Sequence, residues 1–381
     1  MSMTDSANAS TADALTCSRI EAAHLHAFFS LLTRGNLAQG DAQGMPLGQQ
    51  MPIAAIHRRE HDGMRVYEIL ATEIVEHHTT KGDLTFPRED MADAAQLVLQ
   101  QIRSAQDNTV DLSAIEGLLD AMDIYDLQPR TDDLTSLHLR LWTTDGGPLL
   151  GVRLQSLVAG TWLLLDGGRT ANLKFEQQGV RFHQPAVQKI NAMGETDDDS
   201  VEDIAAVARR ILYVESHGGT FRYADVADRV FRSNLLMLDT NLPRILAAMA
   251  YTLHIDGINR ISELTQLASD RNTLKLKDEL VRKHGFYEHK MRQFLLALAW
   301  GMRPAKQWTG RRNAIDALLL VDKQGQPMIY TRQEEHMLAD YLFTHTRMDK
   351  ASPREAHYGL LERENGLYYL KLNLKISLLR R

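Results

Sequence analysis

The chain has 381 residues, 44% of them hydrophobic and 24% charged, which is ordinary for a globular protein of two or three domains. No apolar run approaches the roughly eighteen residues of a membrane span, and the N-terminal segment lacks the basic start and apolar core of a signal peptide. The sequence therefore predicts no membrane span and a cytoplasmic location. The single cysteine, Cys17, excludes an internal disulfide and a cysteine-based metal site.

Charge is distributed unevenly along the chain. Residues 281–381 carry 18 Lys and Arg against 10 Asp and Glu, a net charge of +8, whereas the first 280 residues carry −14. A basic C-terminal third is typical of a face that binds phosphate, although basic helices can also balance acidic ones within a single fold. Charge alone leaves both interpretations open.

The N-terminal third predicts a disordered tail followed by helices. We expect residues 1–17 to be disordered and 18–125 to form a helical region. Apolar residues at helical spacing over 18–34 predict a helix that ends near Gly35, and a Gly- and Gln-rich loop is expected from Gly35 to Met51. Further helical patterns occupy residues 64–78, 89–105 and 111–123.

Residues 126–190 predict a β-hairpin and the strands that follow it. LHLRLW (137–142) and LLGVRLQS (149–156) both alternate with period two, and DGGP (145–148) between them has turn chemistry. Two further strands are expected in TWLLLD (161–166) and NLKFEQ (172–177).

Residues 191–381 predict a helical segment followed by basic C-terminal strands. The acidic run 195–203 is suited to the N-terminal end of a helix, and helical patterns continue to about residue 300. Strands are expected at 317–322, in PMIYT and at 367–379, with a helix at 333–343. The predicted fold class is α+β, with one mixed central sheet.

Familiar catalytic signatures are missing from the sequence. It has no GxGxxG, GxxxxGK[ST], HExxH or GxSxG motif, and its histidines do not fall at zinc-binding spacing. Taken by themselves, the residues indicate an α+β protein with a basic region suited to DNA.

Several segments taken together resemble the HpaII-type family of type II restriction endonucleases. They occur in the family's order and at its spacing, so their co-occurrence indicates the family more strongly than any single match. The segments are FRSNLLMLDTNLPRIL (231–246), FYEHKMRQFLLALAWGMRP (286–304) with Trp308 and Gly310 after it, YLFTHT (341–346) and YYLKLNLKI (368–376).

The resemblance implies Mg²⁺-dependent hydrolysis of a DNA phosphodiester by a nuclease core of the PD-(D/E)XK kind. Such a core needs an acid on one strand of a hairpin, and an acid and a lysine two residues apart on the next strand. Here Gln155 stands at the lysine position, Arg153 lies two residues before it, and His138 stands at the first acid. Asn313 occupies a further acidic position of the family.

These departures make the metal ligands uncertain, because Mg²⁺ prefers carboxylate oxygen to imidazole. Glu116, before the hairpin, and Asp145, in its turn, are candidate ligands. The simpler interpretation of Glu116 is a solvated helix residue, and that of Asp145 is a turn residue. Three hypotheses are therefore open: an active endonuclease, a catalytically inactive relative that still binds DNA, and a nuclease that requires a different recognition site or a modified base.

The resemblance also implies partners. Double-stranded DNA with a short GC-rich site, CCGG-like, is the expected substrate, and an active enzyme would need a cognate DNA methyltransferase encoded nearby to protect the genome. A homodimer is an open alternative to a monomer. The basic residues around Trp308 are the candidate DNA contacts, since guanidinium groups suit both phosphate and guanine edges. These residues are Arg303, Lys306, Arg311 and Arg312.

Overall fold

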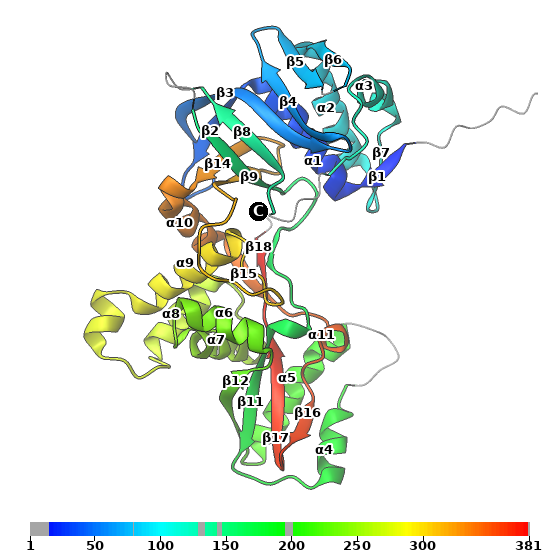
Figure 1. Cartoon of the computed structure of the whole chain (residues 1–381). Helices are drawn as coiled ribbons and strands as arrows, with labels where there is room; N and C mark the ends of the chain where they lie inside the picture. The colour runs from blue at the N-terminus through cyan, green and yellow to red at the C-terminus, as the bar shows by residue number, and fades with distance from the viewer. Residues whose placement is uncertain (1–14, 79, 129–133, 143–146, 195–200, 380–381) are drawn as a thin grey trace, which may run out of the picture. The chain divides into compact units, whose positions relative to one another are not determined.

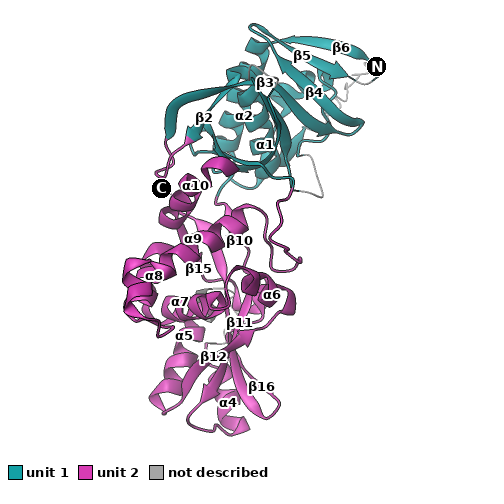
Figure 2. Ribbon diagram, turned by 60° about the vertical axis from the view of Figure 1, so that its left-hand side comes forward, with its two compact units in different colours: residues 1–39, 46–160, 314–331 teal, residues 40–45, 161–313, 332–381 magenta. Residues whose placement is uncertain are grey.

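The computed structural model describes residues 15–78, 80–128, 134–142, 147–194 and 201–379, apart from the side chains of 201–203. These residues form two compact units, each assembled from segments far apart in sequence (Figure 1, Figure 2). Unit 1 contains residues 1–39, 46–160 and 314–331, and unit 2 contains residues 40–45, 161–313 and 332–381. No described helix is long and apolar enough to cross a membrane.

Unit 1 is built on a mixed nine-stranded sheet in the spatial order β2-β14-β13-β9-β8-β3-β4-β5-β6. Two neighbouring pairs in this order, β9–β13 and β14–β2, are parallel. All the other neighbouring pairs are antiparallel. A separate pair joins β1 and β7. The strands are β1 (Thr16–Ser18), β2 (Asn36–Gly40), β3 (Pro46–Glu60), β4 (Gly63–Ile69), β5 (Glu73–His78), β6 (Gly82–Pro87), β7 (Thr109–Asp111), β8 (Leu137–Leu141), β9 (Leu149–Ser156), β13 (Ala317–Val321) and β14 (Pro327–Thr331).

Helices cover one face of this sheet. They are α1 (Arg19–Arg34), α2 (Arg88–Ser104), α3 (Glu116–Ala121) and the short 3-10 helix η1 (Ser113–Ile115). A capping box between Ser18 and Glu21 starts α1, and Gly35 ends it in the left-handed conformation at φ 62°. The apolar residues of α1 and α2 share one core with Leu139 and Val152 of the sheet. The helices expected at 18–34 and 89–105 are confirmed.

The helix expected at 64–78 is wrong, because this segment forms strands β4 and β5. Its inward-facing side chains include Arg65, Tyr67 and Glu76, all fully buried. Charged residues at core positions hide the alternation of polar and apolar residues that normally identifies a half-buried strand. Region 18–125 is therefore mixed rather than helical.

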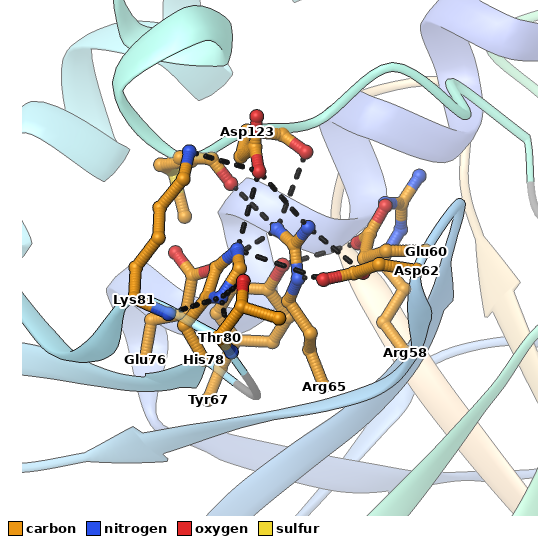
Figure 3. A network of polar contacts seen from close by, with 11 residues as sticks. Arg58, Glu60, Asp62, Arg65, Tyr67, Glu76, His78, Thr80, Lys81 and Asp123 are labelled. Atoms are coloured by element: carbon orange, nitrogen blue, oxygen red, sulfur yellow. Dashed lines mark hydrogen bonds and ion pairs between the residues drawn. The ribbon is translucent and has the colours of Figure 1, made fainter.

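A buried polar network replaces apolar packing at this end of the sheet (Figure 3). Arg65 donates hydrogen bonds to Glu76 at 3.0 Å, to Asp62 at 2.9 Å and to the carbonyl of Met122 at 2.8 Å. Tyr67 donates to Glu60 at 3.0 Å, and Glu60 also pairs with Arg58. Burial raises the pKa of Glu60 and of Glu76, against the opposing effect of the arginines. Each buried charge thus has a partner of opposite sign.

Two further expectations near the N-terminus need correction. The loop expected from Gly35 to Met51 contains β2 and the start of β3. Cys17 does not belong to a disordered tail, since it lies buried in β1 and pairs with Val110 of β7. Of the expected tail, residues 1–14 lie outside the described residues. The helix expected at 111–123 is shorter, because β7 and η1 precede α3.

Unit 2 contains two smaller sheets, in the orders β12-β11-β17-β16 and β10-β18-β15. Leu173 and Phe175 of β11 and Leu370 and Leu372 of β17 form a buried face on the larger sheet. The strands are β10 (Leu163–Leu165), β11 (Asn172–Gln178), β12 (Thr220–Val226), β15 (Thr346–Asp349), β16 (Leu361–Glu364), β17 (Leu367–Asn373) and β18 (Lys375–Leu378). The strands expected at 172–177 and 367–379 are confirmed.

Helices form most of the rest of unit 2. They are α4 (Gln184–Asn191), α5 (Val201–Ser216), α6 (Arg229–Leu238), α7 (Leu242–Asp256), α8 (Ile261–Asp270), α9 (Phe286–Ala299), α10 (Glu335–His345) and α11 (Pro353–Ala356), with short helical turns η2 (Arg169–Ala171), η3 (Glu279–Lys283) and η4 (Arg332–Glu334). Asp228 caps α6, and Gly257 ends α7 at φ 72°. Most of the acidic run expected to open a helix, 195–200, lies outside the described residues.

The mixed α and β character that the sequence predicts is confirmed. One central sheet is too simple a description, since the described strands form four sheets. The expected hairpin 137–156 belongs to unit 1, while β10 and β11, which follow it in sequence, belong to unit 2. Contacts between distant segments, rather than consecutive ranges, define the units.

Candidate active site and nucleic-acid interface

The hairpin predicted from period-two alternation is present, and its pairing brings two histidines together. β8 and β9 run antiparallel with His138 opposite Gly151. On the other side of β8, His138 lies opposite His57 of β3. Directly opposite residues in a sheet point to the same face, so His57, His138 and Gly151 form a row across three strands. This face is opposite to the one that carries Leu139 and Val152 into the core with α1.

Arg153 and Gln155 extend this face along β9. They lie two and four residues beyond Gly151, and both are half-buried. The side-chain amide of Gln155 makes no hydrogen bond within the described part of the chain. It can therefore donate to or accept from an incoming group. The structure therefore brings the three predicted catalytic residues, His138, Arg153 and Gln155, onto one face of neighbouring strands.

The environment of His57 is positively charged. The pKa of His57 is lowered, mainly by burial and then by the charges of Arg140 and His138. Its ring is therefore neutral at neutral pH. Its Nε2 atom is buried and has no hydrogen-bond partner among the described residues. Arg140 lies on the same face as His138, two residues along β8. A face with arginines and a neutral imidazole suits a phosphate oxyanion.

Asp316 adds a carboxylate to the edge of this face. It accepts a hydrogen bond from the Gly151 amide at 3.1 Å, and its own amide donates to the Gly151 carbonyl at 2.7 Å. Gly151 is required here, because a Cβ atom would lie 2.0 Å from the carbonyl oxygen of Ala314. Sequence reasoning missed both Asp316 and His57. The acid immediately before the apolar run 317–321 was a signal for Asp316, whereas no local pattern marks His57.

Of the two predicted metal ligands, the structure describes only Glu116, and it does not place that residue on the hairpin face. Glu116 is exposed at the first residue of α3, and Asp145 lies outside the described residues. Searching the described ranges finds no group of three or more His, Cys, Asp or Glu side chains arranged to hold a metal ion. The roles given to Glu116 and Asp145 therefore stay predictions.

The four basic residues predicted to contact DNA lie in one loop, which we call the basic loop (residues 301–313), between α9 and β13. The side chains of Arg303, Lys306, Arg311 and Arg312 are all exposed. Arg303, Lys306 and Arg311 form no ion pair with any residue that the structure describes. They are available to an external anion such as DNA phosphate.

A buried asparagine holds the middle of the basic loop. Asn234 of α6 is 1% exposed, and its Nδ2 donates to the carbonyls of Arg303 at 3.0 Å and Lys306 at 2.8 Å. Its Oδ1 accepts from the Trp308 amide at 2.9 Å. One side chain thereby satisfies three backbone groups of a segment without regular secondary structure, and so fixes the loop's path.

Asn313 closes the end of the same loop. Its Nδ2 donates to the Trp300 carbonyl at 2.6 Å, and its Oδ1 accepts from Arg332 at 2.7 Å, whose guanidinium lies over the Trp300 ring. A carboxylate at this position could accept from Arg332 but could not donate to Trp300. In this chain, the position that the resemblance gives to an acid is used to anchor a loop.

Comparisons with known proteins agree with the order of the matching segments. A family model described as HpaII restriction endonuclease matches residues 19–378. The chain is 27% identical over 360 residues to the type II restriction enzyme HpaII of Haemophilus parainfluenzae, an alignment that covers 93% of this chain and 96% of that protein. No solved structure matches the chain.

Proposed function

Because this chain belongs to the HpaII restriction endonuclease family, we propose that it is an Mg²⁺-dependent type II endonuclease that hydrolyses double-stranded DNA at a short GC-rich, CCGG-like site. The observation that carries this proposal is the face on which His138, Arg153 and Gln155 lie together. It occupies the hairpin that resembles the family's catalytic segment. A cognate methyltransferase, and assembly as a homodimer, are parts of the same proposal.

Three side chains of the hairpin face have a chemical role in this proposal. Arg153, two residues from Gln155 on the same strand, attracts the scissile phosphate and offsets charge that develops in the transition state, whereas Arg140, opposite Leu149, suits a neighbouring phosphate. The Gln155 amide hydrogen-bonds the attacking water or a phosphate oxygen, in place of a lysine. The ring of His57, whose pKa is lowered and whose Nε2 atom is buried, adds no further positive charge to this face.

The donors present are compatible with Mg²⁺, which type II restriction enzymes generally use. Mg²⁺ is often held by one or two carboxylates and completes its coordination with water and substrate phosphates. Asp316 is the carboxylate on this face that would hold it, with water and substrate phosphates completing the coordination; Gln155 lies four residues farther along β9, about 13 Å at the rise of a strand, and would face the phosphate instead. When bound, the ion polarises a phosphate oxygen and acidifies water.

Specific observations favour a second candidate function, a catalytically inactive protein that binds DNA. Gln155 replaces a lysine, His138 replaces an acid, and Asn313 is committed to anchoring the basic loop. The exposed basic residues of that loop would be retained for binding in either case. DNA binding is therefore common to both candidates, and cleavage separates them.

Plasmid cleavage tests the proposal. We expect a supercoiled plasmid with CCGG sites to be cut in Mg²⁺ or Mn²⁺ but not in EDTA, leaving 5′-phosphate ends, and a matched plasmid without CCGG to stay intact. Cutting at other sites contradicts the proposed recognition sequence alone. Binding without cutting supports the inactive relative, and cutting in EDTA contradicts the metal-dependent scheme.

DNA affinity tests what the two candidates share. Replacing Arg311 and Arg312 by alanine should weaken binding of a duplex, and the slope of log K against log salt should fall by about one for each DNA phosphate that the variant no longer neutralises. Arg181→Ala, which removes an exposed arginine outside the basic loop, is the control. A wild-type protein with no preference for duplex at low salt would contradict both candidates.

A further inference from the structure

A cavity in unit 2 combines aromatic walls with arginines. Its volume is about 330 Å³, and it lies among β11, β12, α7 and the end of α8. Phe175, Tyr223 and Tyr251 contribute rings to its lining, and Arg222, Arg244 and Arg271 are its arginines. No Asp or Glu occurs among its described lining residues. This cavity is built from residues other than those of the hairpin face and the basic loop.

Packing holds the rings in place. Phe175 is 3% exposed, and its ring centroid lies 5.9 Å from that of Tyr251 and 6.2 Å from that of Tyr223. The Tyr251 hydroxyl donates a hydrogen bond to Glu215, which fixes its orientation. The cavity thus presents rigid aromatic surface, which binds planar rings with little loss of side-chain freedom.

The arginines differ in how they are held. Arg271 donates to Thr252 and to Asp256, each at 3.2 Å, so its position is fixed. Arg222 and Arg244 are exposed and form no ion pair with the described residues. The nearby carboxylate of Asp225 is already paired with Arg232 at 2.7 Å. Arg244 is therefore available to an anionic ligand, whereas Arg222 stands opposite Glu176 on the other face of β12 from Tyr223.

We propose that this cavity binds a nucleotide, with the base against the aromatic rings and the phosphate on Arg244. Its volume lies at the lower end of the range for small-ligand pockets, which suits one nucleotide rather than an oligonucleotide. Guanidinium groups bind phosphate through paired hydrogen bonds, and aromatic rings stack on any base. The nucleotide is either one turned out of a DNA duplex or a free mononucleotide. This goes beyond cleavage at the hairpin and does not depend on it.

Calorimetric titration of the full chain tests the chemistry, with dCMP, dGMP and inorganic phosphate as probes. We expect both mononucleotides to bind more tightly than phosphate. Arg244→Ala should weaken mononucleotide binding about tenfold or more, as expected for loss of a charged hydrogen bond. Arg181→Ala, also an exposed arginine of unit 2 but outside the cavity, should leave it unchanged. Thermal unfolding of each variant checks that the fold is intact.

Two duplexes that differ by one mispaired base distinguish the sources. A mispaired base leaves the stack more easily, so tighter binding of the mispaired duplex, abolished in Arg244→Ala, supports a nucleotide turned out of DNA. Equal binding of both duplexes, with mononucleotide binding retained, supports a free nucleotide. The proposal is overturned if Arg244→Ala changes neither mononucleotide binding nor the preference for the mispaired duplex. It is also overturned if inorganic phosphate binds as tightly as the mononucleotides. Because no arm requires cleavage, an inactive hairpin would not affect these outcomes.

Discussion

Gln155 shows how one residue separates the two candidate functions. It occupies the lysine position of the resemblance, on a strand held between β8 and β13. For an active enzyme, Gln155→Ala should lower plasmid cleavage on the order of a hundredfold with DNA affinity nearly unchanged, because a preorganised hydrogen bond at a reacting phosphate contributes ~2–4 kcal/mol to transition-state stability. Gln155→Lys should preserve or raise the rate, since it adds positive charge there.

The same series tests the inactive alternative. For an inactive relative, Gln155→Lys alone should not cut, and only its combination with His138→Asp could restore cleavage, by returning a carboxylate to the first strand. The measurement is plasmid cleavage in Mg²⁺ by the wild type, Gln155→Ala, Gln155→Lys and the Gln155→Lys, His138→Asp double variant. A Gln155→Ala protein that cuts as fast as wild type would show that the hairpin is not the active site, although family membership would stand.

Asp123 predicts a pH-dependent contribution to stability. Lys81 and then His78 hold the pKa of Asp123 well below its ordinary value of 3.8, at 3.0 Å and 3.2 Å (Figure 3). A depressed carboxyl pKa stabilises the fold above the unfolded pKa, and this stabilisation is lost as pH falls through the folded value. Asp123→Asn should therefore lower the free energy of unfolding by ~1–3 kcal/mol at pH 7, with the difference shrinking below about pH 4.

Urea unfolding at pH 7 and pH 2.5 measures this difference, because the stabilisation is lost only as pH falls toward the depressed pKa of Asp123 in the folded protein. Asp93→Asn on α2, an exposed acid that forms no ion pair with described residues, is the control and should change stability little at either pH. Asn also tolerates the positive φ of 56° at position 123, so backbone strain does not confuse the comparison. An equal loss at both pH values would assign the effect to packing instead of charge.

At the scale of elements, the basic loop depends on a helix distant from it in sequence. Asn234→Ala removes three hydrogen bonds to the backbone of the loop and leaves buried groups without partners, which should lower stability by ~1–3 kcal/mol. Because the basic residues lose their fixed positions, duplex affinity should fall even where the protein stays folded. The readouts are gel shifts at low salt, and circular dichroism to confirm the fold.

Asn191→Ala is the matched control for Asn234. The side chain of Asn191 also bonds a backbone segment with both ends of its amide. Its Nδ2 donates to the Leu361 carbonyl at 3.0 Å, and its Oδ1 accepts from the Leu361 backbone amide at 2.8 Å. That segment is β16, which contributes no residue to the basic loop. Similar losses of duplex affinity in both variants would mean that general destabilisation, and not the position of the loop, controls binding.

At the scale of the whole molecule, unit 1 requires a segment far along the chain. β13 lies inside the sheet between β9 and β14, and all five of its residues are buried. Residues 1–160 alone should therefore lack a cooperative thermal transition, because β9 would lose its parallel partner and expose apolar surface. Joining residues 314–331 through a flexible linker of about fifteen residues, long enough for a parallel crossover, should restore the transition.

Calorimetry of the two fragments measures this dependence. A linker fragment in which Leu319 and Val321 are replaced by Asp is the control and should not show the transition, since both residues belong to the core with α1. A cooperative transition in residues 1–160 alone would show that the first 160 residues fold without their distant strands.

The sequence by itself determined the family, the α1 and α2 helices, the β8–β9 hairpin and the location of the basic loop. These depend on signals in the sequence itself: helical periodicity, alternation on either side of a turn, and segments that match the family in its order along the chain. None of them requires knowledge of a tertiary contact. The three hairpin residues come from the family resemblance, and the alternation adds only that Arg153 and Gln155, two apart on a strand, share a face.

Tertiary structure alone decided which distant residues join these local elements. It paired His57 with His138, placed Asp316 beside Gly151 and tied Asn234 to the basic loop, through contacts that span tens to hundreds of residues. It also made β4 and β5 strands, because Arg65 and Glu76 satisfy each other only when the two strands lie side by side. Such pairings leave no periodic trace in the sequence, since each partner is ordinary in its own local context.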